Sequence, residues 1–392
     1  MRIGQARSSY RTFTVVNNRR RKEKASLPLR LPVRGIRFTV AYQAKNRVER
    51  LANISLAAWP DAQRHSRTRA RAGLFAVMLV ASACVSAALA SWLPLQVSIV
   101  TVFLFAGPHN WFELRYFLMR LPARFGRSRN FFAVAFAGIF VLTAAYVAMP
   151  ALYYANLWSG ANWPEAIAAW NTLLLLWVGA LVIIRRRQNS RRDWFWVLPV
   201  VFMLCALNWL APQLFSLAIV YAHPLVALWF LDRHLRRTRP EWLRTYHRCL
   251  MLLPLLVAGM LWQLTRSSSL ADDNGLFWRI TQHAGADLLP NVSSHMLVSL
   301  HVFLEMLHYG VWIVALPLIG ATGALWKVRT IPLARRRGGF PKLIGAVLIF
   351  GLFVVALLWL GFSVNYPAMR DVYFAVAIAH VLAEAPFLLR MI

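Results

Sequence analysis

The sequence has few acidic residues, few cysteines and none of the short motifs that mark common soluble enzymes. Asp and Glu number 14 against 44 Lys and Arg, and the three cysteines, Cys84, Cys205 and Cys249, are far apart. Isolated cysteines favour neither a disulfide framework nor a CxxC site. No GxGxxG, P-loop, HExxH or GxSxG motif stands in its usual context, and no internal repeat is found. The informative feature is therefore the placement of apolar and ionisable residues along the chain.

Apolar residues are far more numerous than the core of a soluble protein requires. The chain has 392 residues, of which 59% are hydrophobic, and it contains 17 Trp. Because roughly 20 helical residues cross the hydrocarbon of a bilayer, the apolar stretches between charged clusters predict an all-α, polytopic transmembrane helical bundle with about ten spans. The predicted spans run approximately from 74 to 93, 95 to 114, 131 to 150, 166 to 184, 194 to 211, 213 to 232, 249 to 265, 296 to 317, 342 to 362 and 372 to 390.

The distribution of basic residues predicts the orientation of these spans. Lys and Arg are retained on the cytoplasmic side of short loops, so with the N-terminus inside only Arg266, Arg279 and Arg370 are external and 41 of the 44 basic residues are cytoplasmic. Both termini are expected in the cytoplasm, and the net charge of +30 is attributed to topology rather than to nucleic-acid binding. Arg outnumbers Lys by 39 to 5, which indicates a G+C-rich genome and favours a bacterial inner membrane.

Residues 1–72 differ in composition from the rest of the chain. They hold 18 basic and 3 acidic residues and no apolar run long enough to span a membrane. The prolines of the segment SLPLRLPVR discourage helix formation. We predict two parts: a basic, disordered cytoplasmic tail at 1–72, which alternatively lies on anionic lipid, and a transmembrane helical domain at 73–392.

Ionisable residues inside the predicted spans are the main functional signal. Each costs about 2.5 to 3.5 kcal/mol on insertion scales and marks a functional site by default. The spacing H-x-x-x-E occurs three times within the spans. Because residues four apart share one helix face, each glutamate is expected to approach the histidine that precedes it. The residues concerned are His109 and Glu113, His223, His301 with Glu305 and His308, and His380 with Glu384.

The depths of these histidines predict a metal site. Their four helices all run from outside to inside, and at roughly 1.5 Å per residue four of the rings fall within about 9 Å of a common plane. Imidazoles from several helices of a bundle can meet at one metal ion. The expected ligands are His109, His223, His308 and His380, with His301 as a fifth candidate nearer the outer face.

The remaining residues predict the surroundings and the identity of the metal. Glu113, Glu305 and Glu384 are expected to accept N–H protons from the rings and to orient them. Imidazoles with carboxylates nearby and no thiolate favour non-haem Fe(II). A bis-histidine haem or another metal is an alternative. No residue is assigned as a general base.

One short motif is similar to that of a known family. Pro108-His109 followed by Glu113 resembles the Pro-His-Gly-x-x-Asp pattern of the Brp/Blh-like membrane β-carotene-cleaving dioxygenases. The resemblance covers about six residues, with Asn110 in place of the glycine and Glu in place of Asp, and the close histidine pair of that family's last site is not present. That family has iron-binding histidines on later helices, to which His223, His308 and His380 would correspond. The resemblance implies a non-haem Fe(II) centre that activates dioxygen beside a lipid-soluble polyene.

Three classes of function are compatible with this pattern. The first is a membrane enzyme that acts oxidatively on a hydrophobic small molecule reached from the bilayer, where aromatic side chains supply apolar walls. The second is a transporter or channel in which the same His and Glu residues move protons or metal ions, and which predicts helices broken near Pro108 and Pro224. The third is a membrane scaffold whose loop 265–295 binds a partner. The first is the main prediction.

Overall fold

The structure, a computed structural model, describes residues 70–188, 194–271, 275–320, 328–335 and 340–391. The predicted basic tail at 1–72 lies almost wholly outside these ranges. Within them the regular secondary structure is entirely helical, which confirms the all-α prediction. All of these residues belong to one compact unit, Thr68–Ile392.

Each of the ten segments predicted to span the membrane is helical. The first helix is Ala70–Trp92. It is followed by α2 (Pro94–Arg120), α3 (Arg129–Tyr154), α4 (Trp163–Gln188), α5 (Val197–Leu210), α6 (Pro212–Thr238) and α7 (Leu243–Leu264). The next span runs without a break through α9 (Ser294–Tyr309), a π-helical turn (Gly310–Ala315) and α10 (Leu316–Gly320). The last two are α12 (Pro341–Val364) and α13 (Tyr366–Met391), and the short elements are Gly126–Ser128, Pro240–Trp242, α8 (Gly275–His283), Val328–Thr330 and α11 (Pro332–Arg335).

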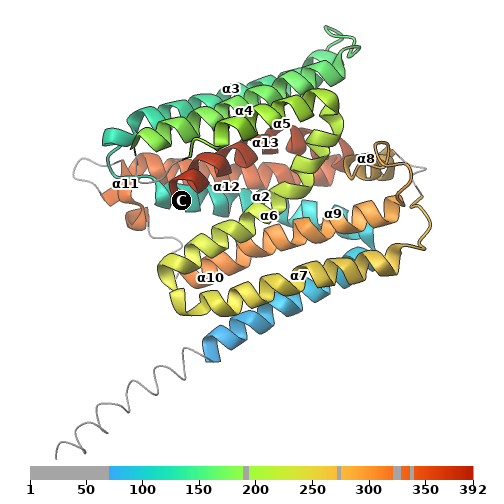
Figure 1. The fold of residues 1–392 in the computed structure, drawn as a ribbon, viewed down its shortest axis with the longest axis horizontal. Helices are drawn as coiled ribbons and strands as arrows, with labels where there is room; N and C mark the ends of the chain where they lie inside the picture. Colours follow the sequence, from blue (N-terminus) through green and yellow to red (C-terminus); the bar gives the residue numbers. More distant parts are fainter. Residues whose placement is uncertain (1–69, 189–193, 272–274, 321–327, 336–339, 392) are drawn as a thin grey trace, which may run out of the picture. The chain divides into compact units, whose positions relative to one another are not determined.

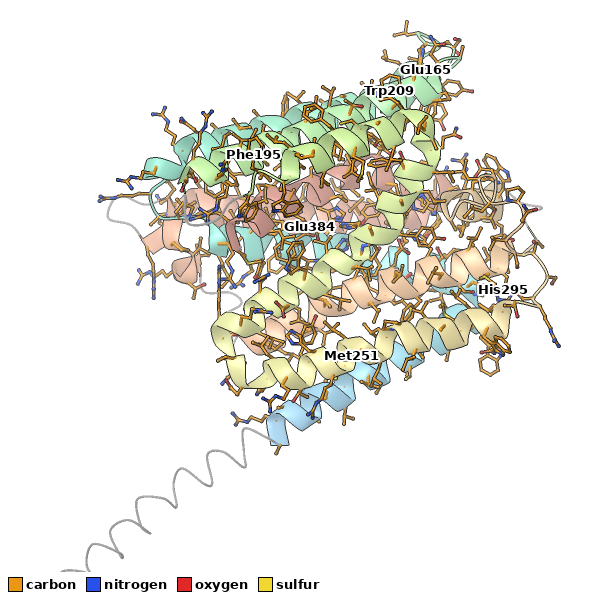
Figure 2. The ribbon with its side chains drawn as sticks, in the orientation of Figure 1. Glu165, Phe195, Trp209, Met251, His295 and Glu384 are labelled. Atoms are coloured by element: carbon orange, nitrogen blue, oxygen red, sulfur yellow. The ribbon has the colours of Figure 1, made fainter. Side chains whose placement is uncertain are left out.

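Among the described residues, eight helices are long and apolar enough to cross a membrane. The helix α2 is not one of them, and it carries Glu113, Arg115 and Arg120. The helix α5 has 14 residues, which at 1.5 Å per residue reach about 21 Å, less than the hydrocarbon thickness of roughly 30 Å. Large apolar side chains such as Met251 and Trp209 point outward (Figure 2), being 75% and 54% exposed. These are the features of an integral membrane protein.

Four helices, α2, α6, α9 and α13, lie at the centre of the described unit (Figure 1). Their contacts close into a ring, in which α2 packs against α9, α9 against α6, α6 against α13, and α13 against α2. The other long helices pack outside it: α12 against α2 and α13, α3 against α13, α4 against α6, and α7 against α9. These four central helices carry every His and Glu that the sequence analysis placed within predicted spans.

Prolines mark both the starts and the interiors of the central helices. Pro94 and Pro212 begin α2 and α6, where the fixed φ suits the first turn and no N–H bond is lost. Pro108, Pro224 and Pro386 lie inside α2, α6 and α13, yet each helix continues through its proline. Packing against neighbouring helices compensates for such interior prolines in membrane helices.

The C-terminal ends of three central helices meet at one end of the unit. The guanidinium of Arg120 donates to Nδ1 of His234 at 2.9 Å, which joins α2 to α6. Arg390 donates to the carbonyl oxygen of Arg120 at 3.1 Å, and Arg237 donates to that of Met391 at 3.3 Å. The three helices α2, α6 and α13 are therefore parallel, as the depth comparison assumed.

The opposite end of the unit joins the N-terminal ends of the central helices to their neighbours. Nε2 of His295 lies 2.9 Å from the carbonyl oxygen of Ser91. Arg279 of α8 forms an ion pair with Asp371 of α13. Two of the three arginines predicted to be external, Arg279 and Arg370, thus lie on elements at this end.

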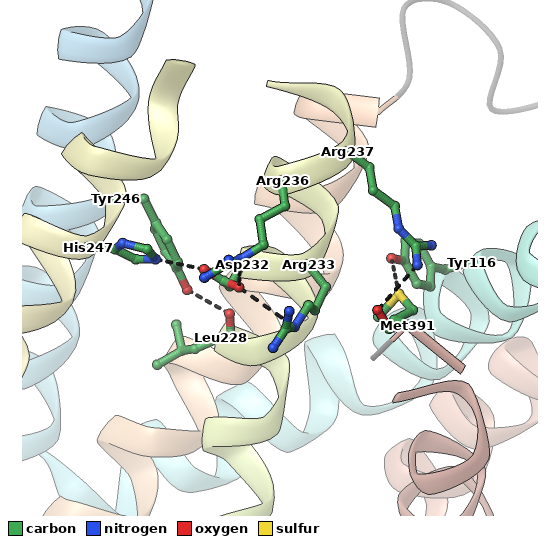
Figure 3. A network of polar contacts seen from close by, with 9 residues as sticks. All are labelled: Tyr116, Leu228, Asp232, Arg233, Arg236, Arg237, Tyr246, His247 and Met391. Carbon is green, nitrogen blue, oxygen red and sulfur yellow. Dashed lines mark hydrogen bonds and ion pairs between the residues drawn. The ribbon is translucent and has the colours of Figure 1, made fainter. Parts of the chain in front are cut away.

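An acidic residue near the end of α6 is used to hold α7 in place (Figure 3). Oδ2 of Asp232 accepts a hydrogen bond from Nε of Arg236 at 2.7 Å, and Oδ1 lies 2.7 Å from Nε2 of His247. The hydroxyl of Tyr246 donates to the carbonyl oxygen of Leu228 at 2.7 Å. Asp232 is therefore a structural residue and does not belong to the buried His and Glu cluster.

The segment 265–295 contains a helix that the sequence did not predict. This helix, α8, buries Ile280 in an apolar cluster and brings His283 beside the ring of central helices. It is followed by Gly285 at φ +90, where a Cβ atom would lie 2.5 Å from Cδ2 of Leu217. The positive φ favours glycine here, and any other residue would also displace the Leu217 side chain.

The predicted orientation can be tested by labelling. In a variant without the three native cysteines, we expect Ser159→Cys in intact cells to react with a membrane-impermeant maleimide and Arg187→Cys to react only after permeabilisation. The physical reason is the retention of the arginine-rich loop after α4 in the cytoplasm. Labelling of Arg187→Cys in intact cells would contradict the proposed topology.

Candidate metal centre

Each of the four central helices contributes one histidine to a cluster of imidazole rings. The ring centroid of His308 lies 5.4 Å from that of His109 and 4.7 Å from that of His223. The centroid of His380 lies 5.1 Å from that of His109 and 5.2 Å from that of His223. The four rings thus follow the closed ring of helices α2, α9, α6 and α13. The structure brings together the four histidines that depth along the helices had selected.

The backbone around His109 fixes the orientation of its ring. Nδ1 of His109 lies 2.9 Å from the carbonyl oxygen of Phe105, one turn earlier in α2. A carbonyl oxygen can only accept, so Nδ1 carries the proton and the lone pair of Nε2 is available to a metal ion. His109 is 1% exposed, so this nitrogen is shielded from bulk water.

Three of the histidines and one glutamate form a compact set of potential ligands, the four-residue group. His109, Glu113, His308 and His380 each offer a ligand atom, and these atoms all lie within 4.8 Å of one another. A metal ion with bonds of about 2.1 Å separates its ligand atoms by up to about 4.2 Å, so the most widely spaced of these atoms would move together by a few tenths of an ångström on binding one ion. Glu113 therefore stands among the potential ligands themselves, whereas the sequence analysis had assigned it only to orienting a ring.

His223 belongs to a second compact set, the three-residue group. Ligand atoms of His223, His308 and Glu384 lie within 4.8 Å of one another. Nδ1 of His223 on α6 lies 3.0 Å from Oε2 of Glu384 on α13. The expectation that Glu384 approaches His380, four residues before it, is thus not what the structure shows. The reason is that α6 packs against α13, so a side chain of the facing helix reaches the carboxylate.

The third predicted pair lies in a separate cluster. Nε2 of His301 is 3.5 Å from Oε1 of Glu305, as the spacing of four residues predicted. The ring of His301 also lies 5.0 Å from that of His283 on α8. His301 and Glu305 are in neither of the two compact groups. The sequence analysis missed His283 because this residue lies outside the predicted spans. A histidine at the end of a short amphipathic segment could have marked it as a candidate.

Several buried polar atoms of the two groups have no hydrogen-bond partner among the described residues. They include both carboxylate oxygens of Glu113, both ring nitrogens of His308, Nδ1 of His380 and Oε1 of Glu384. Glu113 and Glu384 are 1% and 3% exposed, and His308 is 3% exposed. Burying such groups without a partner is costly, so atoms of this kind call for an ion, a water molecule or a ligand. Figure 2 shows Glu384 in the interior of the helix bundle.

A proline or a π-helical turn adjoins three of the four histidines. Pro108 precedes His109, Pro224 follows His223, and the π-helical turn Gly310–Ala315 begins two residues after His308. π-Helical turns are frequent at functional sites.

A cavity of about 140 Å³ adjoins both groups. Its polar wall includes His109, His223, His308 and His380, and it extends to His283, His301 and Glu305. The apolar wall is made of half-buried residues of α3, α6 and α13, whereas most of the polar wall is fully buried. The apolar residues are Tyr146, Ile219, Val220, Ala377, Ile378 and Val381. The more exposed edge of the cavity is therefore its apolar edge.

Replacement of Glu113 tests whether its buried carboxylate needs a ligand. We expect metal-free Glu113→Leu to be more stable than the metal-free wild type by about 1–3 kcal/mol, because the change removes a buried polar group without a partner. The measurement is the free energy of unfolding in detergent with chelator present. The control is Glu241→Leu at an exposed site, which should change stability by less than about 0.5 kcal/mol. Destabilisation by Glu113→Leu would show that the carboxylate is already satisfied by the protein.

Comparison with known proteins adds no further information on this centre. No protein family, curated protein or solved structure matches the chain. What is shown is an all-α bundle with the features of a membrane protein, in which buried His and Glu side chains are placed so that they could hold a metal ion.

Proposed function

We propose that this protein is a membrane-embedded metalloenzyme that uses a non-haem iron ion to oxidise a lipid-soluble substrate. The observation that carries the proposal is the four-residue group of His109, Glu113, His308 and His380, whose ligand atoms lie within 4.8 Å of one another at the centre of the bundle. Purely structural histidines would be expected to have hydrogen-bond partners, yet neither ring nitrogen of His308 has one among the described residues.

The set of donor atoms supports Fe(II). Imidazoles combined with a carboxylate, and with open coordination positions, are typical of non-haem iron enzymes. None of the three cysteines lies in either group. A haem is disfavoured because four imidazole rings with neighbouring centroids 4.7 to 5.4 Å apart leave no flat slot for a macrocycle. The bound metal would supply the activation of dioxygen.

The protein's own residues have three roles in this proposal. Nδ1 of His109 keeps its proton on the Phe105 carbonyl oxygen and leaves Nε2 for the metal ion. The surrounding helices exclude bulk water from His109, Glu113 and His308, which are buried. Ile219, Ile378 and Val381 guide an apolar chain toward the histidines.

The size of the cavity narrows the class of substrate. About 140 Å³ is less than the roughly 300–1,000 Å³ of sites that enclose a drug-sized ligand. A segment of an extended apolar chain fits this space while the rest of the molecule stays between the helices and the lipid. Cleavage of a carotenoid, as the short Pro108-His109 motif implies, is compatible with this mode of access.

One observation disfavours the transporter alternative. Transporters commonly place their ion sites at discontinuous helices, whereas α2 and α6 continue without a break through Pro108 and Pro224. The enzyme proposal requires no such break in the helices.

Iron content tests the centre. After anaerobic reconstitution with Fe(II), we expect the purified wild type to retain iron and His308→Ala to retain none, since His308 belongs to both groups. Glu113→Gln should weaken iron binding by at least about ten- to a hundredfold, the loss typical even for residues that only support a ligand. Iron per chain is measured by elemental analysis, alongside consumption of a polyene under dioxygen. If no preparation of the wild type binds metal, the enzyme proposal is wrong.

The same preparations separate the enzyme from the transporter. A transporter would keep its metal in Glu305→Gln while losing a pH-driven flux in proteoliposomes, because the glutamate would carry the proton or ion. An enzyme would show no such flux in the wild type. A wild-type flux that Glu305→Gln abolishes would favour the transporter.

Access from the lipid can be tested separately from metal binding. We expect Val381→Trp, in the apolar wall of the cavity, to lower substrate consumption at least about tenfold by filling the space while iron content stays unchanged. Val376→Trp is the matched control on the same helix, because Val376 is 54% exposed and does not line the cavity. Equal activity of both variants would show that substrate enters elsewhere.

A further inference from the structure

We propose that the centre holds a second metal ion, bound by His223, His308 and Glu384 beside the ion of the four-residue group. The inference rests on the metal-binding function proposed above and goes beyond it, since the sequence predicted one ion held by four histidines. In the structure His223 is not part of the compact set that contains His109 and His380, and it forms its own set with His308 and Glu384. Two overlapping sets predict two ions.

The contact between His223 and Glu384 fits a pair of ligands on one ion. Nδ1 of His223 and Oε2 of Glu384 are 3.0 Å apart. Two metal–ligand bonds of about 2.1 Å at a right angle place their outer atoms about 3.0 Å apart. An ion pair would give the same distance, but Oε1 of Glu384 is also buried and, among the described residues, accepts no hydrogen bond of good geometry, although the Trp312 side chain lies nearby. A metal ion would satisfy this oxygen as well.

His308 is able to serve both groups. Both of its ring nitrogens are buried, and among the described residues neither forms a hydrogen bond of good geometry, although the backbone of Pro224 lies close to the ring. One nitrogen can bind the ion of the four-residue group and the other the ion of the three-residue group. If each nitrogen of His308 binds one ion at about 2.1 Å, the two ions lie about 6 Å apart across the imidazole ring. Binding through both nitrogens releases the ring proton of His308 to the solvent.

The charges of the two groups also favour two cations. Each group contains one carboxylate: Glu113, whose two oxygens have no hydrogen-bond partner among the described residues, and Glu384, which lies beside only the imidazole of His223 in its group. Both carboxylates are buried, with exposures of 1% and 3%. An uncompensated buried carboxylate is strongly destabilising. One divalent ion per group compensates each carboxylate directly.

The experiment is the stoichiometry of Fe(II) in the purified full-length chain, loaded anaerobically and desalted before elemental analysis. We expect about two ions per wild-type chain, because each group binds one ion. His223→Ala and Glu384→Gln should each retain about one, the ion of the four-residue group. Glu305→Gln is the matched control, a buried glutamate of the same cavity outside both groups, and it should retain the wild-type content. Loading with Cu(II) should give a magnetically coupled pair in the wild type and an isolated ion in Glu384→Gln.

The possible outcomes distinguish this inference from the function on which it rests. One ion per wild-type chain, unchanged in His223→Ala and Glu384→Gln, would overturn the second site and leave the first intact. Two ions that persist in both variants would overturn the assignment to these residues. Absence of iron from the wild type would overturn the proposed function as well. Thermal unfolding in detergent checks that each variant is folded. If Glu384→Gln does not fold, Glu384→Asp replaces it in the experiment, because Asp keeps a carboxylate on a shorter side chain.

Discussion

The cost of placing ionisable side chains inside a bilayer is the constraint on which the centre of this protein depends. A charged group in the hydrocarbon has no water to bond, so it must face other polar groups or an ion. Here the buried His and Glu side chains of four helices face one another around a common cavity. The mutual arrangement of α2, α6, α9 and α13 thereby decides which of these groups meet.

The rest of the bundle serves to hold that arrangement. Polar contacts join the ends of the central helices, with Arg120 and Arg390 at one end and Arg279 and Asp371 at the other. Between the ends, contact is largely apolar, and the outer helices carry large exposed apolar side chains. Membrane helices gain little from hydrophobic burial between them, so packing and a few hydrogen bonds determine their positions. The polar ends thus fix the relative heights of the histidines.

The shape of the cavity connects this architecture to the proposed chemistry. Water is excluded on the polar side because the histidines are surrounded by helices, while the half-buried apolar edge is formed by α3, α6 and α13. A hydrophobic molecule would approach along that edge and meet the metal-binding side chains with its chain extended. A second ion on the far side of the His308 ring would add positive charge close to the first ion and would compensate the buried carboxylate of Glu384.

Hydropathy and charge alone determined that the chain is an all-α bundle with membrane-spanning helices, because the length of an apolar helix is set by bilayer thickness and not by the neighbouring helices. The rarity of acids within the apolar runs also selected Glu113, Glu305 and Glu384, and spacing along one helix correctly paired His301 with Glu305. Contacts between helices could not be predicted in this way. Only the tertiary structure placed Glu384 against His223, gave Glu113 a position among the ligands, and brought His283 of α8 to the cavity. The physical reason is that the period of a helix specifies which residues share its own face, whereas the partner across an interface depends on how two helices pack and at what height.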